Sequence, residues 1–173
     1  GEGEFTFLEV IKALENGKPI RGILGTSFVA DDGSIVHNPD RELMTDLDIL
    51  PFPARHLVLN VEEVNKSYDR IITSRGCPFG CTFCDSNKIW GKKVRFRSVK
   101  NVIDEIKEIK HDFGVISFCI DDDTFTINPR YVEELCDEFI EDNLGISWWC
   151  QIRTENITES LVEKMKKAGC TTC

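Results

Sequence analysis

The sequence contains no long apolar run, and no stretch approaches the roughly 20 consecutive apolar residues that a membrane-spanning helix needs. It also lacks an initiator Met and any basic-then-apolar signal pattern, since it begins with GEGE. Positive charge is the scarcer sign: 21 Lys and Arg residues face 30 Asp and Glu residues, giving a net charge of −9. These absences predict no membrane span and argue against nucleic-acid binding through bulk charge. The start of the sequence suggests a piece of a longer protein.

Cysteine, by contrast, is abundant, with eight residues in a chain of 173. In a small secreted chain this number would suggest disulfide bonds. The missing secretory signal, and the position of Cys119, Cys136 and Cys150 inside apolar runs, favour the reducing cytoplasm instead. We therefore expect these three cysteines, together with Cys170 and Cys173, to be buried thiols.

The N-terminal part of the sequence predicts a helix and a hairpin. Apolar residues at helical spacing predict a helix over 5–16, and Gly17 is a typical C-terminal stop. Residues 22–38 alternate around a DDG turn and predict a β-hairpin with its tip at 31–33. Two prolines in LPFPAR exclude regular structure from the segment 40–56.

From residue 70 onward the pattern alternates between strands and helices. Short apolar runs predict strands near 70–74, 114–121, 146–152 and 170–173. Amphipathic stretches between them predict helices over 98–110, 128–142 and 158–168, with Ser98, Asn128 and Thr158 as N-caps. This order predicts an α/β fold with parallel strands and right-handed crossovers, either an open sheet or part of a barrel.

Polar residues follow three of the predicted strands. The cysteine-containing stretch follows the first strand, Asp121, Asp122 and Asp123 follow the second, and Gln151 and Arg153 end the third. Because the carboxyl ends of parallel strands meet at one edge of a sheet, we expect these groups to converge there.

The stretch TSRGCPFGCTFCDS at 73–86 places Cys77, Cys81 and Cys84 at spacings of four and three positions. Three cysteines in a tight loop suit an iron–sulfur cluster, in which one iron keeps a ligand that the protein does not supply. Gly76 and Gly80 would let the backbone fold closely around such a cluster.

The alternative for these cysteines is structural zinc or a redox-sensing cysteine module. A structural zinc site uses four protein ligands, so Cys170 and Cys173 would have to complete it. Their distance in sequence from Cys84 far exceeds the usual ~15–20 residues between ligand pairs. The spacing therefore favours the cluster over zinc.

The pattern Cys77-x-x-x-Cys81-x-x-Cys84, with Phe83 before the last cysteine, resembles the signature of the radical S-adenosylmethionine (SAM) superfamily. Nearly the whole chain is similar to its branch with a cobalamin-binding domain. The similar stretches are GEGE at 1–4, DLDILPFPAR at 46–55, TSRGCPFGCTFC at 73–84, RFRSVKNVIDEI at 95–106, DDTFTINP at 122–129 and IRTENIT at 152–158.

This resemblance implies a domain organisation. Residues 70–173 would form the N-terminal half of a radical SAM partial (β/α) barrel with parallel strands. Residues 1–69, with the small helix and hairpin, would be a linker or the tail of an upstream cobalamin-binding domain. Cobalamin is implied for the full-length protein but not for this chain, which lacks the cobalt-ligating His motif and is expected to be inactive in isolation.

The resemblance also implies cofactors and residue roles. Cys77, Cys81 and Cys84 would ligate a [4Fe-4S] cluster, and SAM would bind the fourth iron and be cleaved reductively to a 5′-deoxyadenosyl radical. The remaining implied roles are contact with adenine through the backbone of Phe83, contact with the SAM amino group through Asp122 and Asp123 in preference to Asp121, and contact with the SAM carboxylate or ribose through Arg153. The plain alternatives are a solvated acidic turn for the aspartates and a surface ion pair for Arg153.

The implied reaction in the full protein is cobalamin-dependent methyl transfer or a radical ring rearrangement on a small-molecule substrate. A methylthiotransferase shares the cysteine loop and is the alternative enzyme. The one basic stretch of the chain would be a solvated face, or a docking surface for a flavodoxin or ferredoxin-type electron donor. Its residues are Lys88, Lys92, Lys93, Arg95 and Arg97.

Overall fold

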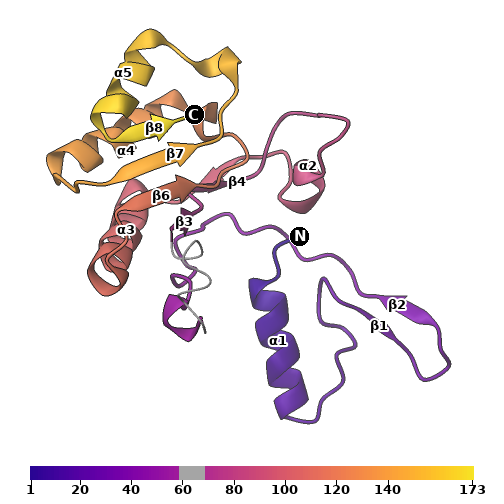
Figure 1. The fold of residues 1–173 in the computed structure, drawn as a ribbon. Helices are drawn as coiled ribbons and strands as arrows, with labels where there is room; N and C mark the ends of the chain where they lie inside the picture. Colours follow the sequence, from indigo (N-terminus) through magenta and orange to yellow (C-terminus); the bar gives the residue numbers. More distant parts are fainter. Residues whose placement is uncertain (59–68) are drawn as a thin grey trace. The chain divides into compact units, whose positions relative to one another are not determined.

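The computed structural model describes residues 1–58 and 69–173, which divide into two units (Figure 1). One unit comprises Gly1–Thr45 and Gly76–Lys93, and the other comprises Asp46–Arg75 and Val94–Cys173. The chain therefore leaves the second unit after Arg75 and returns to it at Val94. The predicted boundary at residue 69 stays a prediction, and the neighbouring positions 59–68 lie outside the described residues.

A parallel sheet of four strands organises the second unit, as the sequence predicted. In spatial order its strands are β3 (Arg70–Ile71), β6 (Ser117–Ile120), β7 (Ser147–Cys150) and β8 (Cys170–Thr172). Ile71 lies opposite Ile120, and Ile120 lies opposite Cys150, so three of the strands end at the same level. The sheet thus presents three carboxyl ends side by side.

Helices connect the strands in the predicted order (Figure 1). They are α3 (Val99–Phe113), α4 (Pro129–Glu141) and α5 (Glu159–Lys167). The predicted N-caps are confirmed: the side chains of Ser98, Asn128 and Thr158 each accept a hydrogen bond from a backbone N–H in the first turn of the following helix. In the described ranges, no helix combines the length and apolar character needed to cross a membrane.

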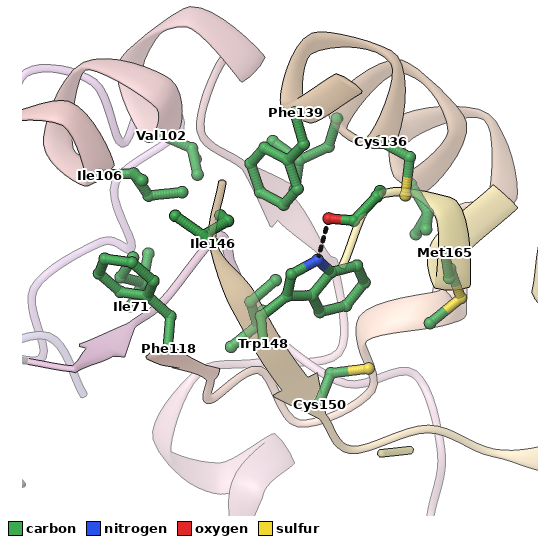
Figure 2. Close-up of a cluster of buried hydrophobic side chains, with 14 of the residues drawn as sticks. Ile71, Val102, Ile106, Phe118, Cys136, Phe139, Ile146, Trp148, Cys150 and Met165 are labelled. Carbon is green, nitrogen blue, oxygen red and sulfur yellow. Dashed lines mark hydrogen bonds between the residues drawn. The ribbon is translucent and has the colours of Figure 1, made fainter. Parts of the chain in front are cut away.

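The apolar faces of these helices meet the sheet in one core, part of which Figure 2 shows. Trp148 is 1% exposed, and its indole N–H donates a hydrogen bond of 2.9 Å to the carbonyl of Ala168. The rings of Phe125 and Phe139 contact it edge-on. Trp149 is 37% exposed, because successive side chains on a strand point to opposite faces of the sheet.

The predicted first strand at 70–74 is wrong in detail, because the chain bends after Ile71 and forms two short strands. Residues Ser74–Arg75 form β4, which pairs antiparallel with β5 (Arg95–Phe96). Two-residue strands are too short to produce a periodic pattern, so this pairing left no signal in the sequence.

The first unit contains the predicted helix and hairpin. Helix α1 spans Glu4–Glu15, and β1 (Ser27–Val29) pairs antiparallel with β2 (Ile35–His37). The segment between the hairpin and β3 is irregular where the structure describes it, as predicted, apart from a short 3₁₀ helix at Arg55–Leu57.

Gly169 ends α5 and leads directly into β8, at a position that excludes a side chain. Its φ is +97°, and a Cβ atom there would lie 2.2 Å from the carbonyl oxygen of Ile146. We expect Gly169→Ala to lower the free energy of unfolding by about 3 kcal/mol or more, because backbone strain of about 1–3 kcal/mol adds to this clash. Thermal unfolding followed by circular dichroism measures the effect.

Gly114, which ends α3, provides the matched control for this substitution. Its φ is +68°, but no heavy atom lies within 4 Å of the position that an added Cβ atom would occupy. We expect Gly114→Ala to lower the free energy of unfolding by about 1–2 kcal/mol, because alanine disfavours the left-handed conformation but meets no clash. Equal losses in the two variants would contradict the role assigned to the Ile146 carbonyl.

Candidate functional site

The carboxyl ends of β6 and β7 carry the aspartates, Gln151 and Arg153, which the sequence singled out. Because these strands are adjacent and end in register, the residues that follow them lie at one edge of the sheet, as predicted. The cysteines belong to the other unit, so their convergence with this edge stays a prediction. The turn after β6 is tied to the end of β7 by a hydrogen bond of 3.0 Å from the N–H of Phe125 to the carbonyl of Gln151. We refer to this edge, residues 121–125 and 151–153, as the sheet rim.

Asp122 is the most enclosed aspartate of the sheet rim, with 2% of its surface exposed. Its Oδ1 atom accepts hydrogen bonds from the backbone N–H groups of Thr73 (2.7 Å) and Ser74 (3.1 Å). Its Oδ2 atom accepts hydrogen bonds from the hydroxyl groups of the same two residues, at 2.6 Å and 2.7 Å. Burial raises the pKa of Asp122, and the hydrogen bonds from Thr73 and Ser74 oppose that rise.

The two flanking aspartates have different surroundings. Asp121 forms an ion pair of 2.7 Å with Arg70 at the protein surface. Asp123 is exposed, and the hydroxyl of Thr124 donates a hydrogen bond to its backbone carbonyl. Of the three aspartates, Asp122 is buried, Asp121 is half-buried and Asp123 is exposed.

Arg153 follows β7 and is half-buried. Its guanidinium forms an ion pair of 2.6 Å with Glu155, whose side chain is more than half exposed. Such surface pairs are worth about 0–1 kcal/mol, so a ligand carboxylate can compete with Glu155 for the guanidinium. Contact between Arg153 and SAM stays a prediction.

The three cysteines of the signature lie on one loop of the first unit, which continues directly from β4. The N–H of Cys77 donates to the carbonyl of Gly91 at 3.2 Å, and the N–H of Cys84 donates to the carbonyl of Cys81 at 3.2 Å. A short helix, α2 (Ser86–Ile89), follows the last cysteine. These bonds close the segment 77–91 into a loop, which we call the cysteine loop.

Exposure increases along the cysteine loop. Cys77 is buried, Cys81 is intermediate and Cys84 is exposed, while Phe83 is 92% exposed. Gly76 adopts a φ of +107°, as expected for a residue that turns the backbone sharply. Gly80 shows no such conformation, and no heavy atom lies within 4 Å of the position that an added Cβ atom would occupy. That it lets the backbone fold closely around a cluster stays a prediction.

The cysteines of the cysteine loop are all reduced. No disulfide bond links any of the eight cysteines, all of which lie within the described residues. Over residues 1–58 and 69–173, no three His, Cys, Asp or Glu side chains are gathered to hold a single metal ion. This arrangement gives no support to a closed zinc site, whose ligands must converge on one ion.

The remaining cysteines differ in burial from one another. Cys119, Cys136 and Cys150 are buried as predicted, and burial raises the pKa of Cys119 to about 11 and that of Cys136 to about 12. The prediction is wrong for Cys173, which is exposed, and Cys170 is only half-buried. A hydrogen bond between the Cys150 and Cys170 thiols is the main cause of the raised pKa of Cys150.

The predicted solvated basic face is wrong for two of its five members. Lys88, Lys92 and Lys93 are exposed, but Arg95 is buried, and Arg97 forms an ion pair with the buried Glu105. From the sequence alone, Arg95 and Arg97 were predicted to lie at the surface. The structure instead shows that Arg97 neutralises an acidic residue in the interior.

The roles of Thr73, Ser74 and Glu105 were not predicted from the sequence. Thr73 and Ser74 carry no signal, because their role depends on β3 and β6 being neighbours. Glu105 did carry one: it lies on the same helix face as Val102 and Ile109, where an acidic residue needs a buried partner.

The chain is similar to known proteins in family, in sequence and in fold. The family model of the Radical SAM superfamily matches residues 71–172. An uncharacterised methyltransferase of Pyrococcus horikoshii is 35% identical, over 99% of this chain and 38% of its own length. An anaerobic magnesium-protoporphyrin IX monomethyl ester cyclase of Rubrivivax gelatinosus is 33% identical, over 98% of this chain and 32% of its own length. The chain thus spans about a third of these relatives.

A solved structure shares the fold. The radical SAM methyltransferase TsrM of Kitasatospora setae, solved with cobalamin and a [4Fe-4S] cluster, superposes with a TM-score of 0.78 at 19% identity, covering 98% of this chain and 35% of that one. The parallel sheet, the signature cysteines and a family match over more than half of the chain agree with one another. The chain belongs to the radical SAM superfamily.

Proposed function

We propose that this chain carries the cluster-binding loop and part of the SAM-binding rim of a radical SAM enzyme. The observation that carries the proposal is the cysteine loop: three cysteines at the signature spacing, none in a disulfide bond, within the segment that the family description covers. Cys77, Cys81 and Cys84 would each ligate one iron of a [4Fe-4S] cluster.

The donor set of the cysteine loop fits such a cluster. Cluster cysteines bind different irons, so their sulfur atoms need not converge on one point as the ligands of a single zinc ion must. Three thiolates leave one iron for the amino and carboxylate groups of SAM. When bound, the cluster supplies the electron that cleaves SAM reductively to a 5′-deoxyadenosyl radical.

The chain's own residues would bind and orient SAM. We assign the contact with the SAM ammonium group to Asp123, because Asp123 is an exposed residue of the sheet rim while the carboxylate of Asp122 is enclosed by Thr73 and Ser74. A carboxylate at this position gives a charge-assisted hydrogen bond to an ammonium group. Arg153 would bind the SAM carboxylate or ribose, and Phe83 would contact adenine through its backbone.

For the whole protein we propose methyl transfer to a small-molecule substrate with the help of cobalamin. Support comes from relatives named as methyltransferases, among them the cytidylyl-2-hydroxyethylphosphonate methyltransferase of Streptomyces wedmorensis, 29% identical over 98% of this chain and 38% of its own length. A radical cyclisation is the second candidate, because similar relatives carry a cyclase name. A putative methylthiotransferase of Methanocaldococcus jannaschii aligns with less of the chain, 64%.

The electron that the cluster needs would come from a flavodoxin or ferredoxin-type donor. Lys88, Lys92 and Lys93 are exposed on or beside α2, close in sequence to the last cysteine, and would attract an acidic donor. The thiolate ligands require a reducing compartment, so we place the protein in the cytoplasm.

Anaerobic reconstitution with iron and sulfide tests the proposed function. We expect about four irons per chain, as three-plus-one ligation requires, and a change in the electron paramagnetic resonance (EPR) spectrum of the reduced cluster when SAM is added. Both readouts are independent of turnover. A single zinc ion per chain that survives reconstitution would refute the proposal and favour a structural metal.

A further inference from the structure

The carboxylate of Asp122 joins two parts of the sheet where regular strand pairing has stopped. The β3–β6 ladder ends at Ile71 and Ile120, and Asp122 then accepts four hydrogen bonds from Thr73 and Ser74. All three side chains are buried, at 2% exposure or less for Asp122 and Thr73 and 6% for Ser74. Side-chain and backbone donors thus replace the missing ladder bonds.

These four hydrogen bonds use the whole accepting capacity of the carboxylate. An ionised Asp has about four lone-pair positions, and the two backbone N–H groups occupy Oδ1 while the two hydroxyl groups occupy Oδ2. No position remains for the ammonium group of a ligand. A direct role for Asp122 in binding SAM would require the contacts with Thr73 or Ser74 to break first.

The anchored residues lead straight into the cysteine loop. Ser74 opens β4, Arg75 ends it, and Gly76 and Cys77 follow directly in the chain. The conformation at Thr73 and Ser74 therefore determines how the backbone leaves the sheet, shortly before the loop begins.

We propose that Asp122 is a positioning residue for the cluster: it holds the backbone at Thr73 and Ser74 from which the cysteine loop starts, and does not bind SAM. This inference rests on the proposed function of the cysteine loop as the cluster site. Adjacent aspartates then have different roles: Asp122 fixes the backbone at Thr73 and Ser74, and Asp123 binds SAM.

The substitution Asp122→Asn distinguishes a positioning role from SAM binding, because the amide keeps the shape of the carboxylate and loses its charge. In Asp122→Asn the Oδ1 atom still accepts both backbone N–H groups, and the Nδ2 group donates to both hydroxyls, which can accept as well as donate. We expect this variant to retain the iron content of the wild type and the change of its EPR spectrum on adding SAM. An Asp122→Asn protein that keeps its cluster but no longer responds to SAM would overturn the proposal.

Asp122→Ala removes all four acceptor contacts, and we expect it to lose most of its iron after the same reconstitution. Iron and sulfide per chain, with the EPR line shape, are measured on protein shown to be folded by circular dichroism. Asp121→Asn is the control, since it removes a neighbouring charge that pairs with Arg70 at the surface, and its iron content should equal that of the wild type. Wild-type iron content and line shape in Asp122→Ala would overturn the proposal.

A milder variant covers the case in which Asp122→Ala does not fold. Thr73→Val combined with Ser74→Ala keeps both backbone N–H donors and removes both hydroxyls, so we expect partial loss of the cluster and an altered EPR line shape. An unchanged cluster in this double variant would contradict the positioning role of Asp122. Failure of the proposed function looks different, because the wild type itself would then fail to bind four irons.

Discussion

Replacing Cys77, Cys81 or Cys84 with Ala is expected to abolish the [4Fe-4S] cluster. Each of these thiolates would bind a different iron, so the loss of any one leaves two protein ligands, too few to hold the cluster against chelation. Iron and sulfide content after anaerobic reconstitution, together with the visible absorption of the cluster, measures the effect. This is the largest functional change that we expect from a single substitution in the chain.

Cys119→Ala and Cys136→Ala are the matched controls for these variants. Both residues are buried, with pKa values raised to about 11 and about 12, and such thiols are poor metal ligands because the thiolate is the ligating form. We expect iron content per folded chain to be unchanged in both. A cluster that survives Cys84→Ala but not Cys136→Ala would move the metal site to the sheet unit and refute the assignment.

Replacing Glu105 with Ala is expected to cause the largest loss of stability, about 3–5 kcal/mol in the free energy of unfolding. Glu105 is 1% exposed and pairs with two arginines, Arg55 at 2.6 Å and Arg97. Its removal leaves both guanidinium groups without their carboxylate partner, and Arg55 is itself only 6% exposed. For a chain of this size the loss corresponds to a fall of roughly 6–20 °C in the unfolding midpoint.

Asp104→Ala, at the preceding position of the same helix, is the control for Glu105. Asp104 pairs with Lys100 on the surface, where the Lys side chain is 82% exposed, and surface pairs are worth about 0–1 kcal/mol. Urea or thermal unfolding of the two variants side by side measures the difference. Similar midpoints for both would show that water reaches Arg55 and Arg97 once the carboxylate is gone.

The fold was largely predictable because its signals are local. Ser98, Asn128 and Thr158 cap the helices that their positions predicted, and the alternation of short apolar runs with amphipathic stretches indicated the parallel sheet. Each of these signals lies within a few residues of the structure that it specifies. The cysteine spacing is local in the same sense, which is why the loop was recognisable.

The parts that could not be predicted depend on partners distant in sequence. Asp122 looks like one of three equivalent aspartates until β6 is placed beside β3, when Thr73 and Ser74 become its neighbours. Arg97 looks like surface charge until the position of Glu105 is known. Charge and composition alone do not reveal which polar residue is buried, because burial follows from the packing of other elements.

The antiparallel pair β4–β5 has a consequence for how the chain can vary. Ser74 lies opposite Phe96 and Arg75 opposite Arg95, so the two ends of the intervening segment are held together by backbone pairing. The entropy of closing a loop grows only slowly with its length, by about 0.6 kcal/mol for each doubling. Insertions between Cys84 and Arg95 would therefore cost the sheet little, and this stretch can be lengthened while β4 and β5 stay paired.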